Sequence, residues 1–179
     1  MTQQFASKIV VSAVLVLICA QGTARAADTP DTWLTMKTKV SLMTTDGVRT
    51  SDLNVDTVNG IVTLHGKVAT EAEKEKAADV ARHVDGVKDV KNLLQIVPKS
   101  QRAVVERSDD AIKSSVEAAF KANHRINDSG IKVASVNKGV VLLSGKTKSL
   151  EAHLESVQVA DAVRGVRRVS TEVEVVPAS

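Results

Sequence analysis

The chain has 179 residues, 43% of them hydrophobic and 25% charged, which fits one ordinary globular domain or two small ones. Aromatic residues make up only 2%, so the core must be aliphatic, and sites that stack bases, sugars or flat cofactors on rings are not expected. The formal net charge of +3 is too small and too dispersed to indicate a nucleic-acid-binding face.

The N-terminal segment 1–26 has the pattern of an export signal. Lys8 supplies positive charge, the stretch 9–20 is largely apolar, and Ala24-Arg25-Ala26 matches a cleavage site. The apolar stretch is short for a permanent membrane span. We therefore expect cleavage after Ala26 and a soluble, exported mature protein with a formal net charge of +1.

Cys19 leaves a second interpretation open, in which the chain is a lipoprotein anchored through this cysteine. A lipoprotein signal needs a small residue before the cysteine, whereas Ile18 is bulky. Cleavage after Ala26 would remove the only cysteine of the chain, so that no disulfide could form.

An internal repeat defines the architecture. A shift of 79 residues aligns GIVTLHG at 60–66 with GVVLLSG at 139–145, and continues without a gap to the C-terminal strand. Upstream the shift is 78, and we assign the extra residue, Lys138, to the loop of a hairpin. The repeat predicts two domains, 31–98 and 109–177, joined by a polar linker, 99–108.

Each unit has the predicted order αββαβ. Apolar spacing of three and four residues indicates helices, and alternation of apolar and polar residues indicates strands. The first unit is expected to contain a helix at 32–43, strands at 52–58 and 60–68, a helix at 70–84 and a strand at 90–97. The second is expected to contain the same elements at 110–122, 130–136, 139–147, 149–163 and 169–176.

Particular residues are expected to end these elements. Asp31 and Asp109 precede the first helix of each unit and are predicted N-caps, because a carboxylate can accept the free N–H groups of the first turn. Gly86 and Gly165 follow the second helices, where a residue with positive φ ends a helix at low cost.

Alternation also predicts which sheet face is buried. Val62 and Leu64 in the first unit, and Val141 and Leu143 in the second, should face the helices. No helix of the same unit is expected to cover the opposite face of the sheet. That face could pack against the other unit, bind a partner, or remain exposed. In the second unit this face should carry Lys132, Val140, Leu142, Ser144, Lys146, Glu172 and Glu174.

The pattern G-[IV]-V-x-L-x-G, followed by a helix and by G-V-x-x-V, resembles the BON domain and occurs in both units. The resemblance covers nearly all of residues 31–177. It implies an α+β fold of two tandem BON domains, each a small mixed three-stranded sheet with two helices on one face. Tandem BON domains behind a signal are similar to the osmotically inducible periplasmic family. The resemblance therefore implies phospholipid binding and protection of the cell envelope under osmotic stress.

The sequence offers no catalytic, cofactor or metal site. The four histidines form no metal-ligand spacing, the glycines match no phosphate-binding loop, and no serine lies in a nucleophile elbow. We therefore expect a protein that is not an enzyme and needs no cofactor.

Two features suit contact with a membrane or partner. Trp33 begins the first helix, and Trp favours membrane interfaces, although it could instead pack against its own domain. The other feature is a basic group in the second unit, which could equally be a solvated face: Lys132, Lys146, Lys148, Arg164, Arg167 and Arg168.

Two functions follow from these features. The first is a periplasmic module that binds anionic phospholipid surfaces or envelope proteins. The alternative is a protein-binding adaptor or chaperone-like stress protein that contacts its clients through Val140 and Leu142. The lipid, the partner and the oligomeric state are not specified by the sequence.

Overall fold

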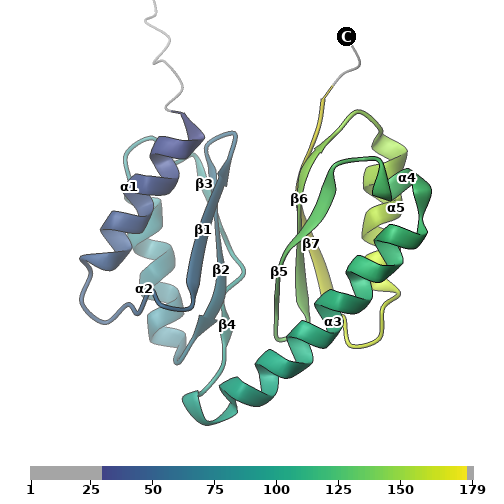
Figure 1. Ribbon diagram of the computed structural model, residues 1–179. Coiled ribbons are helices and arrows are strands. Elements are labelled where there is room, and N and C mark those ends of the chain that lie inside the picture. Colours follow the sequence, from purple (N-terminus) through teal and green to yellow (C-terminus); the bar gives the residue numbers. More distant parts are fainter. Residues whose placement is uncertain (1–29, 177–179) are drawn as a thin grey trace, which may run out of the picture.

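The computed structural model describes residues 30–176. The expected export signal, the cleavage site after Ala26 and Cys19 all lie outside the described residues. The described chain forms two units, each with helices on one side of a small sheet (Figure 1).

The elements follow the order αββαβ twice, as the sequence predicts. Those of the first unit are α1 (Asp31–Met43), β1 (Leu53–Val58), β2 (Ile61–Val68), α2 (Glu71–Arg82), β3 (Asp89–Asn92) and β4 (Gln95–Ile96). A 3₁₀ turn, η1 (Lys99–Gln101), leads into the second unit. Its elements are α3 (Arg102–Ala122), a short α4 (His124–Asn127), β5 (Ile131–Asn137), β6 (Val140–Thr147), α5 (Leu150–Asp161) and β7 (Arg168–Val175).

Each sheet is mixed. In the first unit β2 pairs antiparallel with β1 and parallel with β3 and β4, and in the second β6 pairs antiparallel with β5 and parallel with β7. A parallel pair needs a crossover connection, which the helices α2 and α5 provide. The α+β fold with two helices on one face of each sheet is therefore confirmed.

The predicted inward positions are buried. Val62, Leu64, Val141 and Leu143 are all 0% exposed and pack under the helices of their own units. Each unit thus has its own aliphatic core, formed by alternate strand residues and the inner faces of two helices.

The predicted capping role of Asp31 and Asp109 is wrong. Both residues lie inside helices, and Pro30 and Gln101 occupy the N-cap positions. The Asp31 carboxylate instead accepts hydrogen bonds from the backbone N–H groups of Asn59 and Gly60, at 2.7 Å each. In both units this carboxylate ties the first helix to the hairpin turn, a partner that is distant in sequence.

In the second unit the same contact is more deeply buried. Asp109 is 3% exposed and accepts hydrogen bonds from the N–H groups of Lys138 and Gly139, at 2.9 and 3.0 Å. It also forms an ion pair with the Lys67 ammonium of the first unit, at 3.3 Å. Asp109 therefore joins a helix, a turn and the neighbouring unit.

The extra residue of the second unit does not lie in the hairpin loop. Both hairpins close with two residues of positive φ, Asn59-Gly60 and Lys138-Gly139, so the two turns are equivalent. The register instead shifts between Val133 and Ser135, which leaves an unpaired residue in β5. The insertion is a β-bulge at Ala134, which a strand accommodates by a local bend.

Two further boundaries differ from the expectation. The first helix of the second unit begins at Arg102, so most of the segment 99–108 is helical rather than irregular. The last strand of the first unit is split into β3 and β4, and Leu94 between them is 0% exposed. The two units are consequently joined by a helix and a short 3₁₀ turn.

The outer sheet faces cover each other. Figure 1 shows the two sheets face to face with the helices outside, and β2 contacts β5 across the gap. Thr63 and His65 of the first unit are 1% and 5% exposed, and Val140 and Leu142 of the second are 7% and 1% exposed. Of the three possibilities for this face, the structure shows that it covers the other unit.

Replacing Asp109 with Ala should lower the free energy of unfolding by about 3 kcal/mol, because two backbone donors and the Lys67 ammonium lose their acceptor in a buried site. Urea denaturation of the Asp109→Ala variant measures this effect. The neighbouring Asp110 is exposed, and Asp110→Ala is the matched control. Equal stability of the two variants would contradict the assigned role.

Candidate functional site

An exposed apolar stripe runs along α1. Its members are spaced three and four residues apart, so they share one helix face. They are Trp33, Met36, Val40 and Met43, with exposed fractions of 55%, 57%, 57% and 70%. We call this stripe the α1 ridge. Single exposed apolar residues are common on protein surfaces, whereas an aligned set of four large ones indicates a contact surface.

The ridge lies opposite the buried face of α1. Leu34, Thr38 and Leu42 are at most 1% exposed and hold the helix against the first unit. At 100° per residue, Lys37 and Lys39 project on the two flanks between these faces. An apolar face flanked by lysines is typical of a helix that lies on a membrane surface.

The second unit provides an internal comparison. The positions equivalent to the ridge are Ala111, Ser114, Ala118 and Lys121, all exposed on α3. This helix keeps the buried residues Ile112, Val116 and Phe120, so the fold does not require large apolar residues on the outer face. The ridge is therefore a property of the first unit alone.

The sequence pointed to Trp33 but missed the other three members of the ridge. Their spacing of three and four residues is readable in the sequence, but spacing alone does not say which face of the helix is exposed. Comparing the two copies position by position would have revealed the ridge, because only the first copy carries it.

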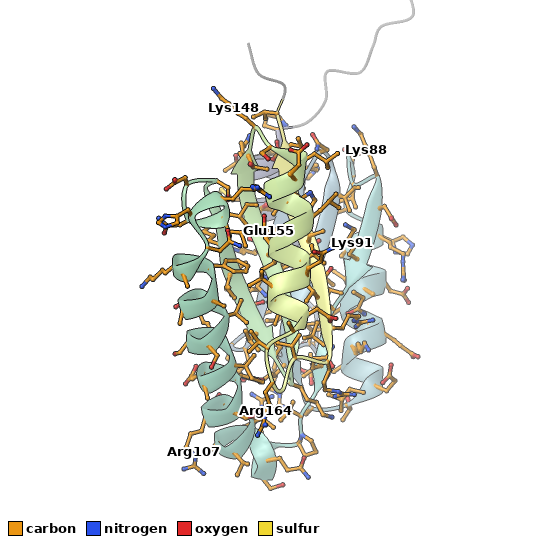
Figure 2. The ribbon with its side chains drawn as sticks, turned by 90° about the vertical axis from the view of Figure 1, so that its right-hand side faces the viewer. Lys88, Lys91, Arg107, Lys148, Glu155 and Arg164 are labelled. Atoms are coloured by element: carbon orange, nitrogen blue, oxygen red, sulfur yellow. The ribbon has the colours of Figure 1, made fainter. Side chains whose placement is uncertain are left out.

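The structure separates the basic group of the second unit into two sets. Lys132 pairs with Ser144 in the sheet, near Lys146, whereas Arg168 pairs with Val140 at the hairpin end. Positions 140 and 146 lie about 20 Å apart at the usual rise of a strand. Figure 2 shows Lys148 and Arg164 at opposite ends of the unit. The six residues do not form one patch.

The two sets have different surroundings. Lys146 forms an ion pair with Glu174 at 3.2 Å, and lines a shallow hollow together with Lys148 and Arg125. Arg167 lies against the hairpin turn at Gly139, and its backbone N–H donates to the Gly139 carbonyl at 2.8 Å. The positive charge of this group is therefore divided between two places, and Glu174 partly offsets it at one of them.

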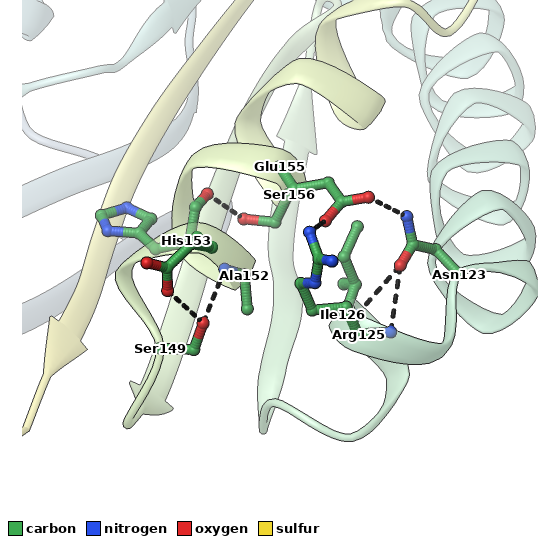
Figure 3. A network of polar contacts seen from close by, with 9 residues as sticks. Asn123, Arg125, Ile126, Ser149, Ala152, His153, Glu155 and Ser156 are labelled. Carbon is green, nitrogen blue, oxygen red and sulfur yellow. Dashed lines mark hydrogen bonds and ion pairs between the residues drawn. The ribbon is translucent and has the colours of Figure 1, made fainter. Parts of the chain in front are cut away.

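Polar side chains near α5 serve the fold. Figure 3 shows Asn123 accepting from the backbone N–H groups of Arg125 and Ile126 and donating to Glu155 at 2.6 Å. The Arg125 guanidinium also pairs with Glu155, at 2.8 Å. The hydrogen bond from Asn123, together with Arg125, holds the pKa of Glu155 below its usual value. This network fixes α4 against α5.

Three of the four histidines have structural partners. His65 shares a hydrogen bond of 2.9 Å with Asp56, and His153 shares one of 2.9 Å with Thr171. His83 bonds the backbone carbonyl of Asp79. Among residues 30–176 no group of three His, Cys, Asp or Glu side chains could hold a metal ion.

A cleft of about 690 Å³ opens between the two units. It is lined by α1, β1 and β2 on one side and by β5, β6 and β7 on the other. Its titratable lining residues include Lys39, Asp56, His65, Lys132 and Glu172. Within the described part of the chain, no helix is both long and apolar enough to span a bilayer.

The chain repeats one αββαβ unit, and this repeat defines a class of small tandem α+β modules. In each copy, glycines flank or end the central strand, β2 or β6, and a glycine with positive φ follows the second helix, α2 or α5. The chain belongs to the BON domain family, whose model matches residues 30–98 and 108–177.

Known proteins show the same relationship. Osmotically-inducible protein Y of Escherichia coli K12 is 31% identical over 80% of this chain and 72% of its own length. Outer membrane lipoprotein DolP of Haemophilus influenzae is 31% identical over 65% of this chain, and the match spans 59% of that protein. Among solved structures, CdsD of the Chlamydia trachomatis type III secretion system covers 80% of this chain and 92% of its own, with a TM-score of 0.35 and 14% identity.

Proposed function

We propose that this BON-domain protein acts without enzymatic activity in the periplasm, where it binds phospholipid membrane surfaces and protects the envelope under osmotic stress. The observation that carries the proposal is the α1 ridge, which is exposed, opposite the core and absent from the second copy. The names of the relatives, one osmotically inducible and one an outer membrane lipoprotein, support the same setting.

The physical basis is burial of the ridge in the interfacial region of a bilayer. Fully burying a large apolar side chain contributes roughly 1.5–3 kcal/mol, and each of these four is about half exposed at the start. Trp33 suits the headgroup level because its ring is apolar while its N–H can stay hydrated. Lys37 and Lys39 would add electrostatic attraction to anionic lipids.

The basic residues of the second unit are proposed as a secondary contact. Lys132 and Lys39 both line the cleft between the two units, so Lys132 lies on the same cleft as one flank of α1. Lys146, Lys148, Arg164, Arg167 and Arg168 face solvent at two separate ends. Each can contribute up to about 1 kcal/mol near an anionic surface.

Replacing Trp33 and Met36 with Ser should reduce partitioning onto vesicles of phosphatidylglycerol and phosphatidylethanolamine by about tenfold or more, because roughly half of the ridge is lost. Co-sedimentation measures the bound fraction. Leu150 and Leu154 are the other exposed apolar pair on one helix, at 53% and 56%, and their double Ser variant is the control. Equal loss in both double variants, or no loss in the first, would rule out the ridge as the contact.

Reversing charge at Arg167 and Arg168 tests the secondary contact. The variant with Glu at both positions should bind vesicles rich in phosphatidylglycerol less tightly and leave binding to phosphatidylcholine vesicles unchanged. Comparison at low and moderate salt adds a check, because an electrostatic contribution weakens with screening. Unchanged binding to both vesicle types would remove these two arginines from the contact.

The location requires its own measurement. Fractionation of producing cells, with sequencing of the mature N-terminus, should yield a periplasmic protein that begins at Ala27. A membrane-bound form that begins at a lipid-modified Cys19 would instead establish the lipoprotein interpretation.

The alternative function, a protein-binding adaptor or chaperone-like factor, relied on Val140 and Leu142 as its contact. Both are covered by the first unit in the structure, at 7% and 1% exposure. Client binding at this face would require the two units to separate.

A further inference from the structure

The sulfur atoms of the described chain are gathered on one surface. The full sequence contains three methionines and one cysteine, and within residues 30–176 the only sulfur-bearing residues are Met36 and Met43. Both belong to the α1 ridge, about two helical turns apart, and their exposed fractions are 57% and 70%. All of the oxidisable sulfur in this part of the chain therefore lies on the exposed face of α1.

Neither core uses methionine. The buried clusters of the two units consist of aliphatic residues and one phenylalanine, Phe120. Methionine ordinarily serves as a flexible side chain that fills irregular gaps in a core. Met36 and Met43 do not have that role, because they lie on the opposite side of α1 from the buried residues Leu34 and Leu42. A chemical change at either sulfur should therefore leave the packing of the unit intact.

The second copy places no sulfur on the equivalent surface. Ser114 and Lys121 occupy the positions of Met36 and Met43 on α3, whose inner face is buried in the same way. The fold of the unit therefore does not require the two methionines, and their chemistry concerns the exposed surface of the first unit.

The two methionines alternate with the other members of the ridge. In chain order the ridge is Trp33, Met36, Val40 and Met43, with neighbours three or four residues apart. If both methionines became polar, Trp33 and Val40 would remain about two turns apart with a polar group between them. A continuous apolar stripe would thus become two isolated apolar residues, which is the ordinary state of a protein surface.

Exposed methionine is oxidised by hydrogen peroxide to methionine sulfoxide, which is polar. A lone pair of the thioether sulfur attacks one peroxide oxygen, an S–O bond forms and the O–O bond breaks. The departing hydroxide takes up the remaining proton and leaves as water, so the sulfur loses two electrons and the peroxide gains them. Methionine sulfoxide reductases restore the thioether. In that step a dithiol becomes a disulfide and the oxygen leaves as water.

We infer that Met36 and Met43 form a reversible oxidation site that controls the α1 ridge. As thioethers they hold the protein on a membrane surface, and as sulfoxides they release it without unfolding it. The inference rests on the proposed function, since the ridge must bind membranes before oxidation can weaken that binding. A sulfoxide buried among apolar groups lacks hydrogen-bond donors for its oxygen, which opposes insertion. Two sulfoxides should lower partitioning onto vesicles about tenfold or more, because half of the ridge is lost.

The test compares reduced and oxidised forms of one preparation. The chain with Cys19→Ser is treated with hydrogen peroxide, and peptide mass spectrometry locates the added oxygen atoms. Met36 and Met43 should each carry one, while the urea midpoint and the circular dichroism stay unchanged. Co-sedimentation with vesicles of phosphatidylglycerol and phosphatidylethanolamine should show the loss of binding. Treatment with reductases for both sulfoxide epimers, together with dithiothreitol, should restore it.

Two variants show whether these sulfur atoms are responsible. Met36→Leu with Met43→Leu removes both, and this variant should bind vesicles equally before and after peroxide, each form being compared only with its own untreated sample. The second variant adds Leu154→Met to this pair, which places a sulfur on α5 at a position that is 56% exposed. Peroxide should oxidise the new methionine and again leave vesicle binding unchanged, because α5 is not the contact.

Three results would overturn the oxidation site. The first is a parent chain that carries both sulfoxides and binds vesicles as tightly as before, which would leave the proposed function standing. The second is a loss of binding that persists in the double Leu variant and so arises at another residue, such as Trp33. The third is a fall in the urea midpoint on oxidation, which would make release a consequence of unfolding. Failure of the untreated chain to bind any vesicle would instead contradict the proposed function, and the oxidation site with it.

Discussion

The carboxylate of Asp109 holds together the three parts on which the structure depends. Two backbone N–H groups of the hairpin turn point at its oxygens, and the Lys67 ammonium of the first unit completes its surroundings. The turn has positive φ at both residues, so it presents its N–H groups together. A single side chain therefore holds the first helix of the second unit against the hairpin turn. It also holds one end of the contact between the two units, through Lys67. Asp31 has only the first of these roles, because no residue of the other unit pairs with it among the described ion pairs.

The repeat makes most of the fold predictable, because an apolar pattern that occurs twice in the same register is unlikely to arise by chance. What the sequence could not supply was the tertiary partner of a residue. Asp31 and Asp109 read as helix caps because a local partner is the commonest one, whereas their true partners lie about thirty residues away. The sequence assigns the insertion to Lys138 itself, because Val58-Asn59 has the same residues as Val136-Asn137. The turn is defined by backbone angles, and these pair Asn59 with Lys138.

The candidate site was predictable in part for a similar reason. Trp33 stands out in the sequence as the only Trp, whereas Met36, Val40 and Met43 are recognised as exposed only once the burial of Leu34 and Leu42 shows which face is inside. The arrangement of the basic group is not readable in the sequence, because it depends on the direction of β6, which places its members at two ends. Positions at which the two copies differ point to the candidate site better than composition does, because the positions that both copies share are those that folding requires.

Because the two units are joined by a short 3₁₀ turn and a helix, their sheets can stay in contact even if their intrinsic affinity for each other is low. A short, stiff link keeps each sheet face close to its partner, which corresponds to a local concentration on the order of millimolar or above. At such a concentration a face that would never dimerise as a separate domain is occupied most of the time.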